Sequence, residues 1–137
     1  MTGERARAAD LSVAGLCRTP FLVGTAAIDR TAVFDEARAA IDMAAGLATA
    51  VLTIVTGDVH PGTKGVADSL KIAAERVADL APYAAERNVR LALEPLSPVY
   101  AGNRSCLTTV RDAVDICEAV GAPNLGIAVN VYHVWWD

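Results

Sequence analysis

The sequence predicts an α/β fold in which about four parallel strands form a sheet covered by helices. Short aliphatic or β-branched runs recur along the chain and end in Gly, Pro or polar residues, as buried strands do. Between them lie stretches whose apolar residues have helical spacing. The runs start at residues 11, 50, 89 and 125, so spacings of 39, 39 and 36 residues indicate a repeating strand–helix unit.

Composition agrees with one folded domain and excludes several classes of function. The chain has 137 residues, of which 53% are hydrophobic and 20% charged, so it is too apolar for a disordered segment. Its net charge of -4 offers no broad positive field for phosphate backbones, so nucleic acid is not an expected partner. No apolar run approaches the roughly 18 to 20 residues that span a bilayer, so we expect no membrane span.

The cysteines indicate a reducing compartment. Cys17, Cys106 and Cys117 are an odd number and lack CxxC spacing, so we interpret them as small core residues. The polar, Ala- and Arg-rich start of the chain does not resemble a signal peptide. The sequence therefore predicts a cytoplasmic protein without disulfide bonds.

The first unit begins with a predicted strand at residues 11–17 and leads to a second strand at 50–56. Thr31 can cap the start of the helix between them. That helix is predicted from the apolar residues Phe34, Ala37, Ile41 and Ala45.

The second unit contains a longer helix and leads to a third strand at residues 89–94. Asn88 lies where a left-handed helix end belongs. Pro82 falls inside the helical pattern and is expected to kink or split the helix near Leu80. The pattern itself consists of Val66, Leu70, Ala74, Val77 and Ala81.

The third unit ends in a predicted strand at residues 125–131. Thr108 can cap its helix at the start, and Gly121 can end the helix in a left-handed conformation. The helix is predicted from Val110, Val114 and Cys117.

Two architectures agree with these units: a doubly wound open sheet and a β/α barrel. Length favours the open sheet, because a barrel has eight units and usually about 250 residues. Local detail favours the barrel, because residues 18–24 lack the G-x-G-x-x-G phosphate loop and ionisable residues follow the strands. For the barrel we expect the strand order 1-2-3-4, and for the open sheet an order that reverses about the first strand.

Glu94 is the main candidate for chemistry. It ends an apolar strand and precedes Pro95, so its carboxylate should lie at the carboxyl-terminal rim of the sheet, where it needs a partner or a metal ion. Asn130 and His133 follow the last strand at the same rim, and the three groups are plausible ligands of a divalent ion. Alternatively, His133 is a structural histidine, and Glu94 pairs with one of the arginines Arg90, Arg104 and Arg18.

Other residues have a functional and a structural interpretation. Arg18 and Arg104 can bind a substrate carboxylate or phosphate, or pair with Glu94. Trp135 and Trp136 can wall a sugar pocket or cover the open sheet. His60 is interpreted as a solvated loop residue.

Three segments carry a resemblance to a known family. Residues 90–96 (RLALEPL), Tyr100 with residues 103–105 (NRS), and residues 129–137 (VNVYHVWWD) resemble the sugar phosphate isomerase/epimerase family, which has a xylose isomerase-like TIM barrel. Residues 12–18, which end in LCR, are similar to the family's second strand. Over residues 11–137 the resemblance implies a partial (β/α)8 TIM barrel with about four parallel strands and covering helices.

The resemblance also implies a function and a site. Members bind a divalent metal ion such as Mn²⁺, Mg²⁺, Co²⁺ or Zn²⁺ through a Glu on the fourth strand, an Asp on the fifth, and a His and a Glu on later strands. They need no organic cofactor and interconvert keto sugars or sugar acids, so a sugar or sugar phosphate is the implied partner. Glu94 would be a metal ligand and a catalytic acid/base, Asn130 the second ligand and His133 a catalytic substrate contact. The implied substrate-binding residues are Arg18, Tyr100, Arg104 and Trp135.

Two departures from the family pattern weaken the implied activity. Asn130 stands where members have Asp, and losing that charge removes on the order of a few kcal/mol of cation attraction at an effective dielectric near 20. Residues 1–137 are expected to form a single incomplete domain that lacks the first strand and the last three. Two ligands and the second carboxylate would lie in those strands, so we expect impaired or no activity from this chain alone.

A second hypothesis belongs to a different class. The chain would be a non-catalytic ligand-binding or interaction module whose open sheet edges pair with a partner or with a second copy of itself. The amide at Asn130 favours this alternative.

Overall fold

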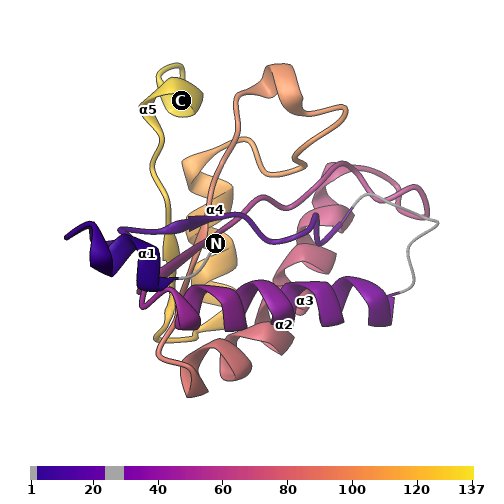
Figure 1. Ribbon diagram of the computed structural model, residues 1–137. Helices are drawn as coiled ribbons and strands as arrows, with labels where there is room; N and C mark the ends of the chain where they lie inside the picture. Colours follow the sequence, from indigo (N-terminus) through magenta and orange to yellow (C-terminus); the bar gives the residue numbers. More distant parts are fainter. Residues whose placement is uncertain (1–2, 24–29) are drawn as a thin grey trace.

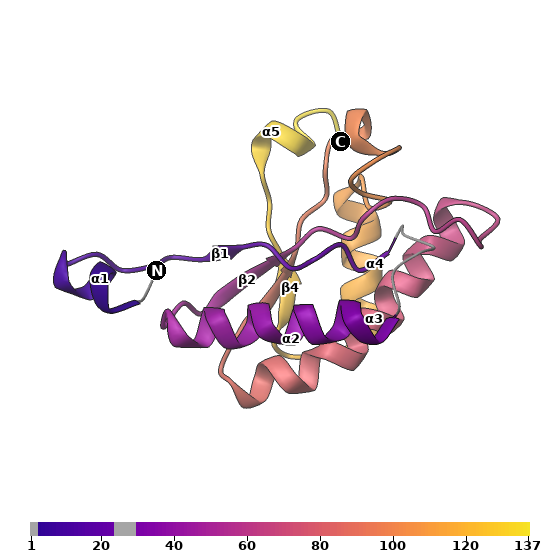
Figure 2. The ribbon, with the colours of Figure 1, turned by 45° about the vertical axis from the view of Figure 1, so that its right-hand side comes forward.

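The computed structural model describes residues 3–23 and 30–137, and its centre is a single parallel sheet. The strands lie in the order β1-β2-β3-β4. Figures 1 and 2 show the chain from two directions, and β1, β2 and β4 are labelled in Figure 2. This sequential order confirms the arrangement predicted for a β/α barrel and contradicts the doubly wound alternative. The strands are β1 (Leu16–Cys17), β2 (Val51–Ile54), β3 (Arg90–Leu93) and β4 (Leu125–Ile127).

Three long helices cover the sheet. Each of them packs on a strand, and α3 also packs on both α2 and α4, so the three form one layer (Figure 2). They are α2 (Arg30–Gly46), α3 (Val66–Glu86) and α4 (Val110–Val120). Shorter helical segments are α1 (Gly3–Ala8), η1 (Pro98–Tyr100) and α5 (Val131–Val134). Within the described ranges, no helix combines the length and apolar character needed to cross a membrane.

The core lies between the helix layer and the two inner strands. Most of the side chains that fill it are aliphatic, and each fully buried Val, Leu or Ile contributes about 1.5–3 kcal/mol of hydrophobic stabilisation. The edge strands β1 and β4 contain no fully buried residue. The largest fully buried side chains are Leu22, Ile41, Leu52, Ile54, Leu80, Leu91, Leu93 and Leu107.

Both edge strands are shorter than predicted. Leu16 pairs with Leu52, so residues 11–14 lie opposite the turn before β2 and have no strand to pair with. At the other edge, β4 ends at Ile127 because the chain turns into α5, for which Asn130 is the N-cap. A strand needs a neighbour over its whole length, and the sequence pattern alone does not report that overlap.

The predicted helix ends are partly correct. Asn88 (φ 57°) and Gly121 (φ 63°) adopt the left-handed conformation, which confirms both expected helix ends. The predicted cap Thr31 is wrong because α2 begins one residue earlier, at Arg30. Thr108 is also wrong by one residue, since Thr109 accepts the hydrogen bond from the backbone N–H of Asp112.

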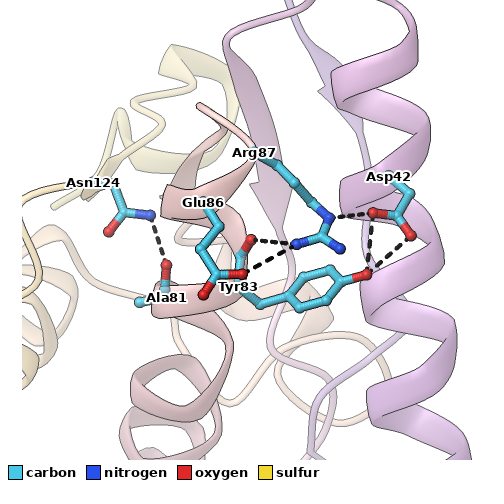
Figure 3. Close-up of polar contacts among 6 residues, drawn as sticks. All are labelled: Asp42, Ala81, Tyr83, Glu86, Arg87 and Asn124. Atoms are coloured by element: carbon cyan, nitrogen blue, oxygen red, sulfur yellow. Dashed lines mark hydrogen bonds and ion pairs between the residues drawn. The ribbon is translucent and has the colours of Figure 1, made fainter.

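Pro82 does not split α3, which runs unbroken from Val66 to Glu86, so of the two expected outcomes near Leu80 the split does not occur. The missing N–H costs one helical hydrogen bond. Leu80 and Ala81, just before the proline, are buried against the core, and this packing stabilises the turn. The amide of Asn124 also donates to the carbonyl of Ala81 at 2.9 Å (Figure 3).

A polar cluster joins α2 to α3 at the end of the sheet where β2 and β3 begin. The Asp42 carboxylate accepts hydrogen bonds from the Arg87 guanidinium and from the Tyr83 hydroxyl, the latter at 3.0 and 3.1 Å (Figure 3). The hydrogen bond from Arg87 holds the pKa of Asp42 below its usual value. This cluster therefore fixes the helix layer far from the rim where the strands end.

Candidate functional site

The carboxyl-terminal ends of the strands meet at one rim, as parallel strands must, and a cavity of about 500 Å³ lies there. Arg18 reaches it from the end of β1, Glu94 from the end of β3 and His133 from α5. Tyr100 and Arg104 reach it from the loop after β3. The structure thus brings five of the predicted site residues to one cavity.

Glu94 is bound by Asn130 rather than by an arginine. The Nδ2 of Asn130 donates to Oε1 of Glu94 at 3.0 Å, while its Oδ1 accepts from the backbone N–H of Tyr132 at 3.1 Å. Because a backbone N–H can only donate, the helix cap fixes the amide with its oxygen toward α5 and its nitrogen toward the carboxylate. No ion pair among the described residues includes Glu94.

His133 is half-buried in the first turn of α5. Its Nδ1 accepts a hydrogen bond from the backbone N–H of Ser97 at 3.3 Å. The ring also lies edge-on to Tyr100 and Tyr132, with centroids 5.6 and 5.0 Å away. In the neutral ring the hydrogen is therefore on Nε2, which remains able to donate to a ligand.

Two guanidinium groups stack on aromatic rings of the cavity. Arg18 lies 4.1 Å from the centroid of Phe21 and donates to the carbonyl of Thr19 at 3.0 Å. Arg104 lies 5.3 Å from the centroid of Tyr100. Stacking of this kind holds a guanidinium by its face and leaves its N–H edges available.

Sequence reasoning missed several residues that line the cavity. Cys17 was interpreted as a core residue, but it is exposed at the cavity and its thiol is free, like those of the other two cysteines. Partial desolvation of the thiol raises its pKa, and the charge of Glu94 raises it further, which disfavours the reactive thiolate. Phe21, Asn103 and Tyr132 line the cavity as well. Tyr132 and Asn103 lie in the segments quoted for the resemblance, whereas Phe21 had no signal.

Three aromatic residues singled out from the sequence lie elsewhere. Trp135 is 80% exposed and does not line the cavity, and Trp136 donates from its indole to the carbonyl of His133. His60 is half-buried rather than solvated, and its Nδ1 accepts from the N–H of Gly62 at 3.1 Å. This contact indicates a structural role for His60 in its own loop.

The described residues supply one candidate ligand for a divalent metal ion. Glu94 is the one carboxylate among the described residues that line the cavity, and its chemistry suits a hard cation. Among the residues that the structure describes, no group of three or more His, Cys, Asp or Glu side chains is close enough to hold an ion. Further ligands would therefore have to come from outside the described set.

The sequence and the fold match known proteins. The family described as xylose isomerase-like TIM barrel matches residues 2–137. The crystal structure of protein SMc04130 from Sinorhizobium meliloti 1021 is 41% identical with a TM-score of 0.89, over 98% of this chain and 49% of that one. This chain belongs to the xylose isomerase-like TIM barrel family. The resemblance found in the sequence is thereby confirmed.

Other members of the xylose isomerase-like fold are more distant in sequence. The 3-keto-D-glucoside 4-epimerase YcjR from E. coli is 14% identical with a TM-score of 0.78, over 96% of this chain and 52% of its own. IolI, solved with a zinc atom, is 14% identical with a TM-score of 0.76, over 96% and 46%. The chain thus spans about half the length of these structures. No curated protein matches the sequence significantly.

Proposed function

We propose that this chain contributes part of a site for metal-dependent proton transfer next to the carbonyl of a keto sugar or sugar acid. The observation that supports this most is the pair of Glu94 and His133 in one cavity at the rim of a xylose isomerase-like sheet. In this site Glu94 is the acid/base group, and Nε2 of His133 donates to a substrate oxygen.

Asn130 orients the proposed base. Its Nδ2 holds Oε1 of Glu94, so the other carboxylate oxygen is directed for proton transfer. Tyr100 and Trp135 are the proposed aromatic contacts of the sugar, with Trp135 reaching only a part of the ligand outside this cavity. The E. coli relative, which is a 3-keto-D-glucoside 4-epimerase, supports a sugar as the substrate.

A divalent metal ion completes the proposal, and zinc in IolI supports it. Glu94 is the proposed first ligand, and a bound ion would polarise a carbonyl or hydroxyl oxygen of the sugar. Asn130 can be a second ligand only if its amide turns over, which gives up both the contact with Glu94 and the cap of α5. Strands beyond those described would supply the remaining ligands, so we propose that this chain alone has impaired activity. We also propose that it acts in the cytoplasm.

The experiment is hydrogen exchange into a ketohexose in D2O with Mn²⁺, measured by mass spectrometry. We expect slow incorporation of one deuterium next to the carbonyl, abolished in Glu94→Gln and unchanged in Glu86→Gln, an exposed carboxylate on α3. Incorporation that survives in Glu94→Gln would exclude this residue as the base. No incorporation above the protein-free rate would favour the non-catalytic alternative.

The alternative is an interaction module, and the free sheet edges favour it. Exposed apolar side chains flank the two edge strands: Leu11 before β1, and Val129, Val131 and Tyr132 after β4. The proposed partner is a second copy, because two four-stranded sheets related by rotation about the barrel axis give the eight parallel strands of a closed barrel. Sedimentation should then detect a dimer that Val131→Lys dissociates, and a monomer at all concentrations would contradict it.

A further inference from the structure

The helix layer covers only one face of the sheet. Residues in register in a parallel sheet share a face, and successive residues of a strand alternate between the two faces. One row in register belongs to the core beneath the helices: Leu16, Leu52, Leu91 and Leu125. The next row, on the opposite face, lies outside that core: Cys17, Thr53, Ala92 and Gly126. Parallel sheets are almost always covered on both faces, so this second face calls for a partner.

The sheet also has two free edges. Among the described residues, β1 pairs only with β2, and β4 pairs only with β3. Residues 11–14 continue the edge of β1 beyond the start of β2, and Figure 2 shows the chain running straight from α1 into β1. Leu11 before β1 and Val129 after β4 are each 64% exposed. Free edges flanked by exposed apolar side chains indicate a surface that other strands cover.

A second copy of this chain is the partner that fits both features. A two-fold rotation about the barrel axis keeps all strands parallel and lays β4 of each copy beside β1 of the other. Two sheets of four strands then give the eight strands of a closed barrel, whose interior is formed by the two uncovered faces. Two copies also match the length of the barrel structures described above, of which one chain spans about half.

Glu94 lies at the rim of the uncovered face. It follows β3 two residues after Ala92, so the strand alternation puts both on the same face, and it lines the rim cavity. In a ring of eight strands, β3 of one copy is the third strand and β3 of the other is the seventh, directly across the barrel. The Glu94 carboxylates of the two copies therefore face each other across one cavity, to which the described residues of each copy bring one carboxylate.

We infer that two copies form one barrel with one shared site, in which the two Glu94 side chains are the acid/base pair. This inference rests on the proposed function for its chemistry, and it makes the second copy a component of the site. The ionised Glu94 takes the proton from the carbon next to the carbonyl, and the electron pair of that C–H bond moves into an enediolate. The protonated Glu94 of the other copy then returns a proton to the opposite side of the same carbon, which gives the epimer.

Sedimentation equilibrium tests the assembly. We expect the 137-residue chain to be a dimer that Leu11→Lys and Val129→Lys each weaken at least about tenfold, because each places a charge where an apolar side chain is covered. Val66→Lys, at an exposed apolar position on α3, is the matched control. A monomer at all concentrations, or equal effects of the three lysines, would overturn the inference.

Cross-linking tests whether the two carboxylates face each other. The background is Cys17→Ser, because the free thiol of Cys17 lies at the same cavity. In this background a short bis-maleimide should join Glu94→Cys between copies at least about tenfold faster than Glu86→Cys, an exposed position at the end of α3, because facing thiols have a high effective concentration. Equal rates would mean that the copies meet through another surface, which overturns the shared site. Circular dichroism melting of each variant shows whether it is folded.

Mixed dimers separate this inference from the proposed function. When parent and Glu94→Gln are refolded together in equal amounts, random pairing leaves about one quarter of the dimers with two Glu94 side chains. Epimer formation from a ketohexose, measured by NMR, should fall to that fraction of the parent value. Retention of about one half, or deuterium incorporation without any epimer, would overturn the pair. Cross-linked dimers that neither form an epimer nor incorporate deuterium would support the shared cavity and refute the proposed proton transfer.

Discussion

The Asn130 side chain donates one hydrogen bond and accepts another, and only an amide can do both. Its replacement by aspartate is therefore expected to change the stability of the rim. Aspartate keeps the cap on Tyr132 but turns a second carboxylate oxygen toward Glu94, where the amide now lies at 3.0 Å. Like charges about that far apart repel by roughly 4 kcal/mol or more at an effective dielectric of 20. Asn130→Asp should therefore melt at a lower temperature in EDTA and recover when Mn²⁺ is added.

The control for this variant is Asn103→Asp, which adds the same charge at the cavity without touching Glu94 in the hydrogen bonds of the structure. Differential scanning fluorimetry of both variants with and without Mn²⁺ measures the effect. If the Asn130→Asp variant has the melting temperature of the parent in EDTA and this temperature does not change with Mn²⁺, residue 130 is remote from any cation.

At the scale of single residues, the sequence predicted positions better than partners. Glu94 and His133 could be located because they follow strands, and strands of one parallel sheet end at the same rim. The hydrogen-bond partner of Glu94 could not be predicted, because an amide and three arginines were all possible partners in the sequence. In the structure the partner is Asn130, because its role as the cap of α5 turns its side-chain nitrogen toward the carboxylate.

At the scale of elements, Gly57 joins three loops near the rim. It has φ 92° after β2, its carbonyl accepts from the N–H of Cys106, and an added Cβ would lie 2.1 Å from the carbonyl oxygen of Val23. Gly57→Ala should lower the free energy of unfolding by about 1–3 kcal/mol or more, from backbone strain alone. Urea unfolding measures this loss.

The matched control is Gly102→Ala, because an added Cβ there meets nothing within 4 Å and the backbone is not left-handed. We expect it to leave the unfolding midpoint nearly unchanged. Equal effects of the two alanines would mean that the loops do not pack at Gly57 as described.

The α2–α3 cluster predicts how stability depends on pH. Because the hydrogen bond from Arg87 lowers the pKa of folded Asp42 below its unfolded value near 3.9, its contribution is present above that value and is lost as pH falls through the folded pKa. Asp42→Asn should therefore lower the free energy of unfolding at pH 7 and lower it less at about pH 2. Urea titrations at both pH values, with exposed Asp115→Asn as control, measure this. A loss that is equally large in acid would contradict it.

The strands and the long helices could be predicted because the pattern of apolar residues that indicates each one lies within that element. Aliphatic runs at near-constant spacing located the three main strand–helix units, and the lack of a phosphate loop after residue 17 favoured the barrel order. The length of β1 was not predictable, because it depends on where β2 begins. Pro82 does not split α3, because burial of its neighbours outweighs the one lost hydrogen bond.

At the scale of the whole molecule, the cavity depends on long-range folding that no local pattern reports. The loop after β3 turns through η1 and brings Tyr100, Asn103 and Arg104 back over the rim, next to His133 from α5. The family resemblance supplied Tyr100, and Asn103 lies in the quoted segment 103–105 although it was not named as a site residue. Trp135 is close to His133 in sequence but is exposed outside the cavity, so its contact with a sugar remains a prediction.

The most direct measurement is a calorimetric titration of the chain with Mn²⁺, parent against Glu94→Gln. If the rim is part of a metal-dependent sugar site, the parent binds Mn²⁺ weakly, because the described residues supply one anionic ligand, and Glu94→Gln binds at least about tenfold less tightly. Mn²⁺ binding of the same strength in both proteins, or none in the parent, would contradict a metal site at Glu94.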